Sequence, residues 1–352
     1  MTKGPLAGVR VLEFAGIGPG PFCCMLLADM GAEIVRILRQ GEASPHDGAM
    51  ARGRHDIALD LKSPEAIETC LQAIETADVL IEGFRPGVME RLGLGPAAAL
   101  ARNPRLVYGR MTGWGQDGPL AKAAGHDINY IALTGALAAI GPPGEPSVPP
   151  LNLVGDFGGG SLYLAFGIAS ALYERERSGK GQVIDAAIVD GAASLMSMFA
   201  SGRYPLDKPR SMLGGAAPYY RCYICADDRQ ISVGALEPKF YELLCQVIGV
   251  EVDAGRLNWA NWPDMSDAFA AIFKTKTRDE WCALLEGTDA CFAPVLDLSE
   301  APAHPHMTAR GVFETHDGRP QPAPAPRFSR TPGAVQGSDG EGAEVLARWR
   351  SQ

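Results

Sequence analysis

Four short segments of the chain carry side chains that can transfer a proton or bind an anion. His126, Asp156 and Glu237 each stand beside glycine or proline, and Arg85 precedes Pro86 in a Gly-Phe-Arg-Pro-Gly turn. Such surroundings are typical of loops and element ends, where a side chain can face a cleft. Histidine titrates near neutral pH and the carboxylates somewhat below it. The set therefore predicts acid/base chemistry on an acidic substrate whose anionic group the arginine binds.

The acidic residues also have structural interpretations. Asp127 can cap a helix that begins near Ile128. Asp156 precedes the apolar stretch 157–173, which is predicted to form one buried helix, and it can be the N-cap of that helix. Glu237 can be a surface residue at another helix start. Residue type alone leaves the catalytic and the structural interpretation open.

Five arginines follow different predicted strand ends and loops: Arg39, Arg52, Arg54, Arg85 and Arg91. In an open α/β sheet such ends gather at one edge, where ligands bind. Guanidinium groups pair well with phosphates. The alternative is a scatter of exposed surface arginines, which is the usual position of charged residues.

Composition limits the class of protein. The chain has 352 residues, of which 46% are hydrophobic, and a formal net charge of -9. That charge argues against general nucleic-acid binding, which needs a basic face. The N-terminus lacks an apolar signal core, and no run of about 18 apolar residues suggests a membrane span. We expect a soluble, cytoplasmic protein that makes no contact with nucleic acid or membrane.

Two short motifs carry no cofactor prediction. Cys222 and Cys225 form a lone C-x-x-C without a second ligand pair, so we expect no metal or redox site. The glycine-rich loop after the first predicted strand resembles a dinucleotide loop. However, Pro19 and Pro21 remove N–H donors, and proline breaks the G-x-G-x-x-G spacing. No NAD site is expected.

The first half of the chain predicts an α/β fold. Strand and helix signals alternate, which favours a parallel sheet covered by helices: strands at 9–14, 33–38, 79–81, 106–108 and 183–189, and helices at 22–30, 64–76, 97–101 and 157–173. A smaller α+β unit follows. The predicted organisation is a large domain over 1–190, a linker over 191–222, a small domain over 223–300, a linker over 301–334, and a C-terminal element over 335–352 that returns to the large domain.

The segments named above, together with most of the chain, resemble the α-methylacyl-CoA racemases, a branch of the family III CoA-transferase superfamily. The similarity includes Thr-Gly-Trp-Gly-Gln at 112–116, Gly-His-Asp-Ile-Asn-Tyr at 125–130 and Val-Gly-Asp-Phe-Gly-Gly-Gly at 154–160. It implies a Rossmann-like large domain plus a small domain, and two chains interlocked as a homodimer. The active site would lie between the large domain of one chain and the small domain of the other.

The resemblance also implies roles for individual residues. His126 and Asp156 would be the proton carriers, Glu237 would support His126, and Asp127 would start the helix that stabilises the enolate. The residues implied to contact coenzyme A are Arg39, Arg52, Arg54, Ala58, Glu82, Arg85, Arg91, Gly125 and Tyr130.

The implied reaction is racemisation of 2-methyl-branched acyl-CoA thioesters by 1,1-proton transfer through an enolate. No separate cofactor would be needed, because coenzyme A is part of the substrate. Two alternatives remain open at this point. One is a CoA-transferase that uses Asp156 as nucleophile, and the other is a non-catalytic acyl-CoA-binding protein.

Overall fold

The fold is seen in a computed structural model that describes residues 4–41, 48–316, 318–337 and 340–351. Contacts divide the chain into two units, each described separately here. Unit 1 comprises residues 1–134, 150–195 and 312–352, and unit 2 comprises 135–149 and 196–311. Unit 2 therefore includes 135–149, a segment within the predicted large domain.

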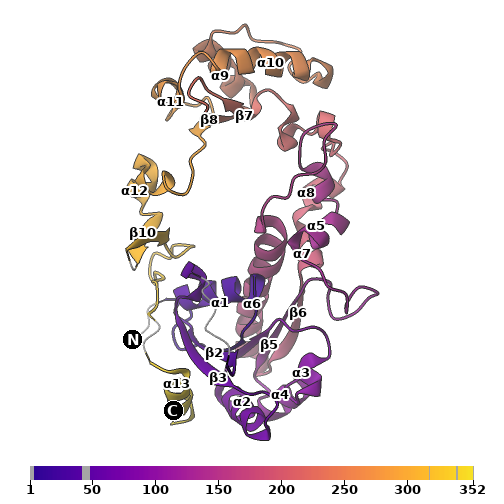
Figure 1. The fold of residues 1–352 in the computed structure, drawn as a ribbon, viewed down its shortest axis with the longest axis vertical. Coiled ribbons are helices and arrows are strands. Elements are labelled where there is room, and N and C mark those ends of the chain that lie inside the picture. Colours follow the sequence, from indigo (N-terminus) through magenta and orange to yellow (C-terminus); the bar gives the residue numbers. More distant parts are fainter. Residues whose placement is uncertain (1–3, 42–47, 317, 338–339, 352) are drawn as a thin grey trace. The chain divides into compact units, whose positions relative to one another are not determined.

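Unit 1 is built on a six-stranded, all-parallel sheet (Figure 1). The strands are β1 (Arg10–Phe14), β2 (Glu33–Arg39), β3 (Arg54–Leu59), β4 (Val79–Glu82), β5 (Val107–Thr112) and β6 (Gln182–Ala187), in the order β3-β2-β1-β4-β5-β6. This is the Rossmann order, and it reverses between β1 and β4. The predicted α/β class with a Rossmann-like domain is confirmed.

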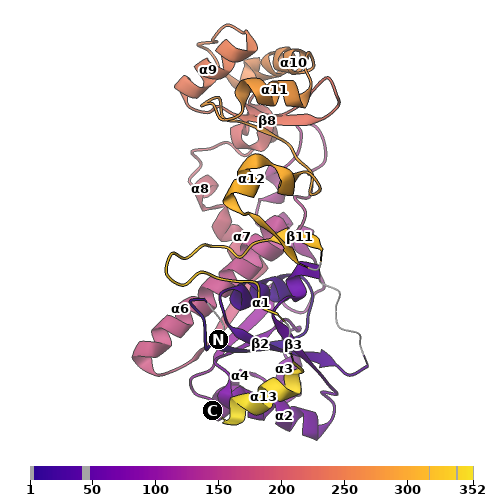
Figure 2. The ribbon, with the colours of Figure 1, turned by 90° about the vertical axis from the view of Figure 1, so that its left-hand side faces the viewer.

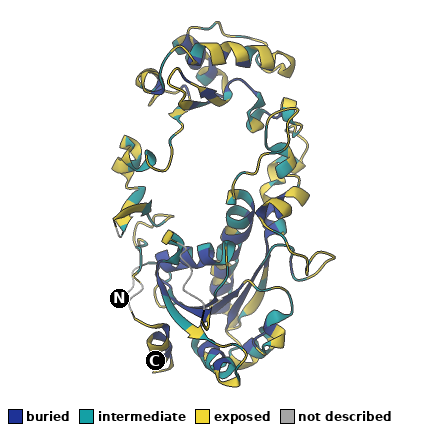
Figure 3. Cartoon of the chain, viewed as in Figure 1, coloured by how far each residue is buried: buried dark blue, intermediate teal, exposed yellow. Residues whose placement is uncertain are grey.

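Helices cover both faces of this sheet, so its central strands are buried on both sides (Figure 3). Val11 of β1 packs on the side of α1 (Pro19–Asp29) and α6 (Leu162–Ser178). Leu12 points to the other side, which holds α2 (Pro64–Thr76), α4 (Pro96–Arg102) and α13 (Gly342–Ser351). The C-terminal helix therefore returns to unit 1, where Trp349 is fully buried.

Local sequence explains where α2 begins. The Ser63 hydroxyl accepts a hydrogen bond from the N–H of Ala66 at 3.1 Å, and Pro64 occupies the first helical position, as predicted. The prediction of one helix over 157–173 is wrong at its start. A π-helix, η3 (Leu153–Ser161), precedes α6, so Asp156 lies inside a helix and is not the N-cap.

The π-helix is held by close glycine contacts with α7 (Ile188–Leu195). A Cβ at Gly191 would lie 1.8 Å from the carbonyl oxygen of Gly159, and a Cβ at Gly159 would lie 2.6 Å from the N of Ala192. No side chain fits there, so both positions require glycine. The π-helix around Asp156 therefore depends on glycine at both positions. Gly159 belongs to the glycine-rich segment 154–160 noted in the sequence.

The remaining elements of unit 1 are short. They are α3 (Val88–Arg91), α5 (Asp127–Leu133), and the hairpin of β10 (Phe313–His316) and β11 (Arg319–Pro322), which lies in the segment predicted to be a linker. Figure 2 shows α13 beside α2 at the end of unit 1 that also holds β2 and β3.

Unit 2 contains an antiparallel sheet of β7 (Tyr220–Ile224), β8 (Gln230–Gly234) and β9 (Phe292–Pro294). Helices α9 (Pro238–Ile248), α10 (Trp262–Phe273) and α11 (Arg278–Leu285) bury an aromatic core against it. Tyr223 stacks on Phe273 at 4.9 Å, and Phe273 packs edge-on to Trp281 at 5.1 Å. Unit 2 also contains short helical elements, among them α8 (Ser197–Ala200) and α12 (Pro305–Arg310).

Candidate active site

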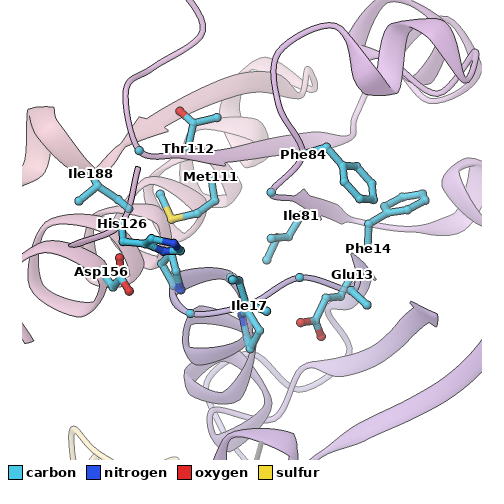
Figure 4. Close-up of a pocket in the computed structure, with 18 of the residues that line it drawn as sticks. Glu13, Phe14, Ile17, Ile81, Phe84, Met111, Thr112, His126, Asp156 and Ile188 are labelled. Atoms are coloured by element: carbon cyan, nitrogen blue, oxygen red, sulfur yellow. The ribbon is translucent and has the colours of Figure 1, made fainter. Parts of the chain in front are cut away.

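A cavity of about 340 Å³ opens at the carboxyl ends of β1, β4 and β5. It lies where the strand order reverses, which is the position at which open α/β sheets bind ligands. Apolar side chains form much of its wall, among them Phe14, Ile81 and Phe84. His126 and Asp156 lie beside each other at one end of the wall (Figure 4).

His126 reaches the cavity from the position immediately before α5. Its backbone N–H donates to Oδ1 of Asn129 at 3.1 Å. The Tyr130 hydroxyl donates to the carbonyl oxygen of Gly125, and the Tyr130 ring packs edge-on to Trp114 at 4.8 Å. A Cβ at Gly125 would lie 2.7 Å from the Tyr130 ring. These contacts fix the backbone around His126, while the His126 residue itself is exposed.

Asp156 enters the cavity from η3 and is half-buried. Its backbone N–H donates to Oδ2 of Asp127 at 2.6 Å. Burial raises the pKa of the Asp156 carboxyl and the charge of Asp127 raises it further, while Asn152 and His126 act in the opposite direction. Asp156 therefore keeps its proton to a higher pH than an exposed aspartate does.

Asp127 joins the two segments that carry these groups. The residue is buried at the start of α5, and its Oδ1 has no hydrogen-bond partner among the described residues. A Cβ at Gly155 would lie 2.3 Å from Oδ2 of Asp127, so this contact also requires glycine. The result is that the His126 imidazole and the Asp156 carboxyl, whose pKa is raised, lie at one end of the same cavity.

Glu237 belongs to unit 2. It occupies the N-cap position of α9 and is exposed. Burial raises the pKa of the Cys291 thiol, and the nearby charge of Glu237 raises it further. The predicted support of His126 by Glu237 stays a prediction.

Three exposed cations line a second hollow, of about 440 Å³: Arg85, Arg91 and Lys122. Two of them were predicted to bind coenzyme A. Sequence reasoning missed Lys122, although its place in the loop after β5, a strand whose end lines the cavity, was an available signal.

The turn after β4 connects this hollow to the cavity. Gly83 and Phe84 line the cavity, and Arg85 lines the hollow. Glu82 holds the turn, because its Oε2 accepts from the N–H of Phe84 at 2.8 Å and its Oε1 from Nε of Arg110 at 2.9 Å. Burial raises the pKa of Glu82. The Glu82 carboxyl thus stabilises the turn, and contact of this residue with coenzyme A stays a prediction.

Arg52 and Arg54 are buried in ion pairs, and their contact with coenzyme A stays a prediction. Arg52 pairs with Asp29 at 2.5 Å, and Arg54 pairs with Glu13 at 3.0 Å. Arg54 also donates to the main-chain carbonyl oxygens of Met50, Arg52 and Pro21. In this arrangement both side chains stabilise the packing around β1 and β3.

The other predicted contacts lie at the same edge of the sheet. Arg39 and Ala58 are exposed at the ends of the neighbouring strands β2 and β3. Gly125 and Tyr130 line the cavity. Their contact with coenzyme A stays a prediction.

Within the described ranges, no group of three or more His, Cys, Asp or Glu residues could hold a metal ion. Cys222 and Cys225 are free thiols, and burial raises the pKa of Cys225 to about 11. None of the described helices combines the length and apolar character that crossing a membrane requires.

The sequence profile of CoA-transferase family III matches residues 6–339, and the chain belongs to this family. It is 48% identical over 335 residues to the alpha-methylacyl-CoA racemase of Mus musculus, which covers 93% of this chain and 87% of that protein. It is 45% identical over 344 residues to the alpha-methylacyl-CoA racemase of Homo sapiens, which covers 93% and 90%. A crystal structure of a CAIB/BAIF family protein from Brucella suis superposes with a TM-score of 0.81 at 26% identity, over 99% of this chain and 100% of that one.

Proposed function

We propose that this protein is an α-methylacyl-CoA racemase, which interconverts the two configurations at the α-carbon of 2-methylacyl-CoA thioesters. One observation carries the proposal. His126 and Asp156 line the same end of one cavity, and the pKa of Asp156 is raised. The 48% identity to a named racemase supports the same reaction.

The α-proton of a thioester is weakly acidic, so the reaction needs a base on one face, an acid on the other, and stabilisation of the enolate oxygen. His126 and Asp156 serve as base and acid, and their roles reverse with the configuration of the substrate. Each such group contributes about 10²–10⁴-fold. Backbone N–H groups at the start of α5, beside Asp127, donate hydrogen bonds to the enolate oxygen.

The protonation states balance over one turnover. The base keeps the proton that it removes, and the acid delivers its own proton to the opposite face, so the two groups end with exchanged states. The raised pKa suits Asp156 to this cycle, because an acid must hold a proton before it can donate one.

Coenzyme A is part of the substrate in this proposal, and no further cofactor takes part. Its phosphates bind at Arg85, Arg91 and Lys122, and its pantetheine arm passes Phe84 into the cavity. The support is the line of residues from the hollow through the turn after β4 to the cavity.

We further infer a cytoplasmic homodimer in which the partner supplies Glu237 to His126. Support comes from α6, where Phe166 and Tyr173 are 72% and 69% exposed and lie on the same side of the helix as Leu162. Large apolar side chains grouped in this way are typical of an interface.

Co-expression of a His126→Ala chain with a Glu237→Ala chain tests the composite site. Mixed dimers restore one intact site if each site uses both chains. Mixed dimers that form without restored activity contradict the inference.

Incubation of the purified protein with several 2-methylacyl-CoA substrates in deuterated water tests the reaction. We expect deuterium at the α-carbon together with loss of optical purity, without an acceptor acid. Absence of α-exchange with all substrates overturns the proposal. Because family III is named for CoA transfer, a second candidate is transfer through an acyl-Asp156 intermediate. It requires an added carboxylate acceptor and a covalent enzyme species detectable by mass spectrometry.

A further inference from the structure

Glu13, a carboxylate that the proposed proton transfer does not use, also lines the cavity. It is the fourth residue of β1 and is only 1% exposed. Oε2 accepts from Nε of Arg54 at 3.0 Å, whereas Oε1 is buried without a hydrogen-bond partner among the described residues. A buried acceptor without a donor is unfavourable, and more so when it is charged.

The neighbouring donors are committed elsewhere. The guanidinium of Arg54 also donates to three carbonyl oxygens, which fix its position. Arg36, opposite Glu13 in the sheet register, forms two hydrogen bonds to Asp56 at 2.7 and 2.9 Å. The Cys24 thiol lies within hydrogen-bonding reach of Glu13 but is only a weak donor, and burial followed by the charge of Glu13 raises its pKa well above the ordinary value. A carboxylate oxygen can accept more than one hydrogen bond. Oε1 therefore has capacity for a donor that comes from the cavity.

The Glu13 carboxylate points toward a side chain that can move at little cost. Figure 4 shows it directed toward Ile17, in the loop between β1 and α1. Ile17 is 80% exposed, so turning it away breaks little packing. Both residues line the cavity, so a ligand bound there lies next to both.

We propose that Oε1 of Glu13 accepts a hydrogen bond from an amide N–H of the pantetheine arm of the acyl-CoA. This inference rests on the proposed function. The thioester belongs at His126 and Asp156 and the phosphates at Arg85, so the part of the ligand between them is the pantetheine arm. Its two secondary amides are its N–H donors. The apolar side chains of Phe14, Ile81 and Phe84 suit its methyl and methylene groups.

Glu13 is thus a specificity residue that distinguishes an amide from a group without a donor. Its pairing with Arg54 fixes the orientation of the carboxylate. The mechanism assigns it no proton transfer.

The test uses an inert S-alkyl-CoA thioether and two analogues, each with one amide N–H replaced by an ester oxygen, with affinity measured by calorimetry. We expect the wild-type protein to bind at least one analogue about 10- to 100-fold more weakly than the parent, because the ester oxygen faces a carboxylate oxygen. In Glu13→Gln, the amide oxygen turns to Arg54 and the NH₂ group faces the cavity, so this preference disappears or reverses. Glu68→Gln, an exposed carboxylate outside the cavity, is the matched control and keeps the wild-type preference.

Equal affinity of the wild-type protein for all three ligands overturns the inference, as does an unchanged preference in Glu13→Gln. If that variant does not fold, Glu13→Gln/Arg54→Met, which removes both charges, replaces it. The α-exchange assay separates the two proposals. Exchange without amide preference overturns only the role of Glu13, whereas amide preference without exchange overturns only the racemase reaction.

Discussion

Two carboxylates line the same cavity and are held in opposite ways. Glu13 is fully buried and paired with an arginine that cannot leave it. Asp156 is half-buried, and the groups that favour its ionised carboxyl are the Asn152 side chain, through a hydrogen bond, and the nearby His126. The pKa of Asp156 is raised chiefly by burial, with a second contribution from Asp127.

The difference shows how one cavity can hold two carboxylates in unlike electrostatic surroundings. An arginine partner stabilises the ionised carboxylate and makes it a permanent acceptor. A carboxylate that must exchange its proton needs the opposite, which is desolvation and a like charge nearby. Each prediction below alters one side of this contrast.

The largest expected effect is on catalysis at Asp156. Asp156→Asn keeps the side-chain shape and removes the titrating group, so α-exchange falls by about 10³-fold or more. Affinity for coenzyme A, measured by calorimetry, stays within a small factor of wild type. Exchange at the wild-type rate contradicts the role of Asp156 as proton carrier.

The next effect is on stability at Arg54. Arg54→Met leaves Glu13 buried and without its cation, which lowers the free energy of unfolding by about 3–5 kcal/mol. Arg102→Met breaks exposed pairs with Glu68 and Glu75 and serves as the control, with little expected change. Denaturant unfolding of both variants measures the difference. Equal free energies of unfolding for the two variants would show that the buried Arg54 pair contributes no more to stability than the exposed pairs.

Two arginines differ in the same way, since Arg85 is exposed in the hollow whereas Arg54 is buried. Arg85→Ala raises KM for the acyl-CoA about tenfold, with kcat and unfolding unchanged. The effect shrinks at high ionic strength, because salt screens an exposed charge. A loss confined to kcat contradicts phosphate binding at this residue.

A smaller effect is expected at Asp127. Asp127→Asn removes the negative charge beside Asp156 and keeps an oxygen that can accept the N–H of Asp156. The pKa of Asp156 falls, so in the direction that needs ionised Asp156 the rising limb of the pH–rate profile moves to lower pH. The change at any one pH is about tenfold at most. A pH–rate profile identical to that of the wild type shows that the charge of Asp127 does not alter the pKa of Asp156.

The smallest effect is the stability of Asp156→Asn itself. A carboxyl whose pKa is raised on folding favours the native state below its unfolded pKa, and this contribution is lost as pH rises through the folded pKa. Removing the carboxyl therefore raises the melting temperature slightly near neutral pH, and the gain disappears in acid. A thermal scan at two pH values checks the sign.

Much of the sheet could be predicted because its strands are short apolar runs between turn signals. The predictions at 9–14 and 33–38 correspond to β1 and β2. β3 was missed, because Arg54, His55 and Asp56 give it a polar start, and only pairing with β2 makes it a strand. The π-helix was missed for a related reason, since its geometry depends on contact with α7, far along the chain.

The candidate site shows the same limit. His126 and Asp156 could be singled out from residue type and neighbouring glycines. The difference between Arg85 and Arg54 could not, because both are arginines near strand ends. What separates them is a carboxylate, Glu13, placed 41 residues earlier and brought near by the sheet. Ion-pair partners so far apart in sequence are brought together only by the fold, so the sequence alone does not identify them.

The return of α13 to unit 1 has a consequence for biosynthesis. Val345, Leu346 and Trp349 are buried in one of the two cores of the sheet. These residues are synthesised after the whole of unit 2. Unit 1 therefore cannot complete that core until unit 2 has been made. A chain that lacks α13 (Gly342–Ser351) should leave this face of the sheet uncovered and be cleared by cellular quality control.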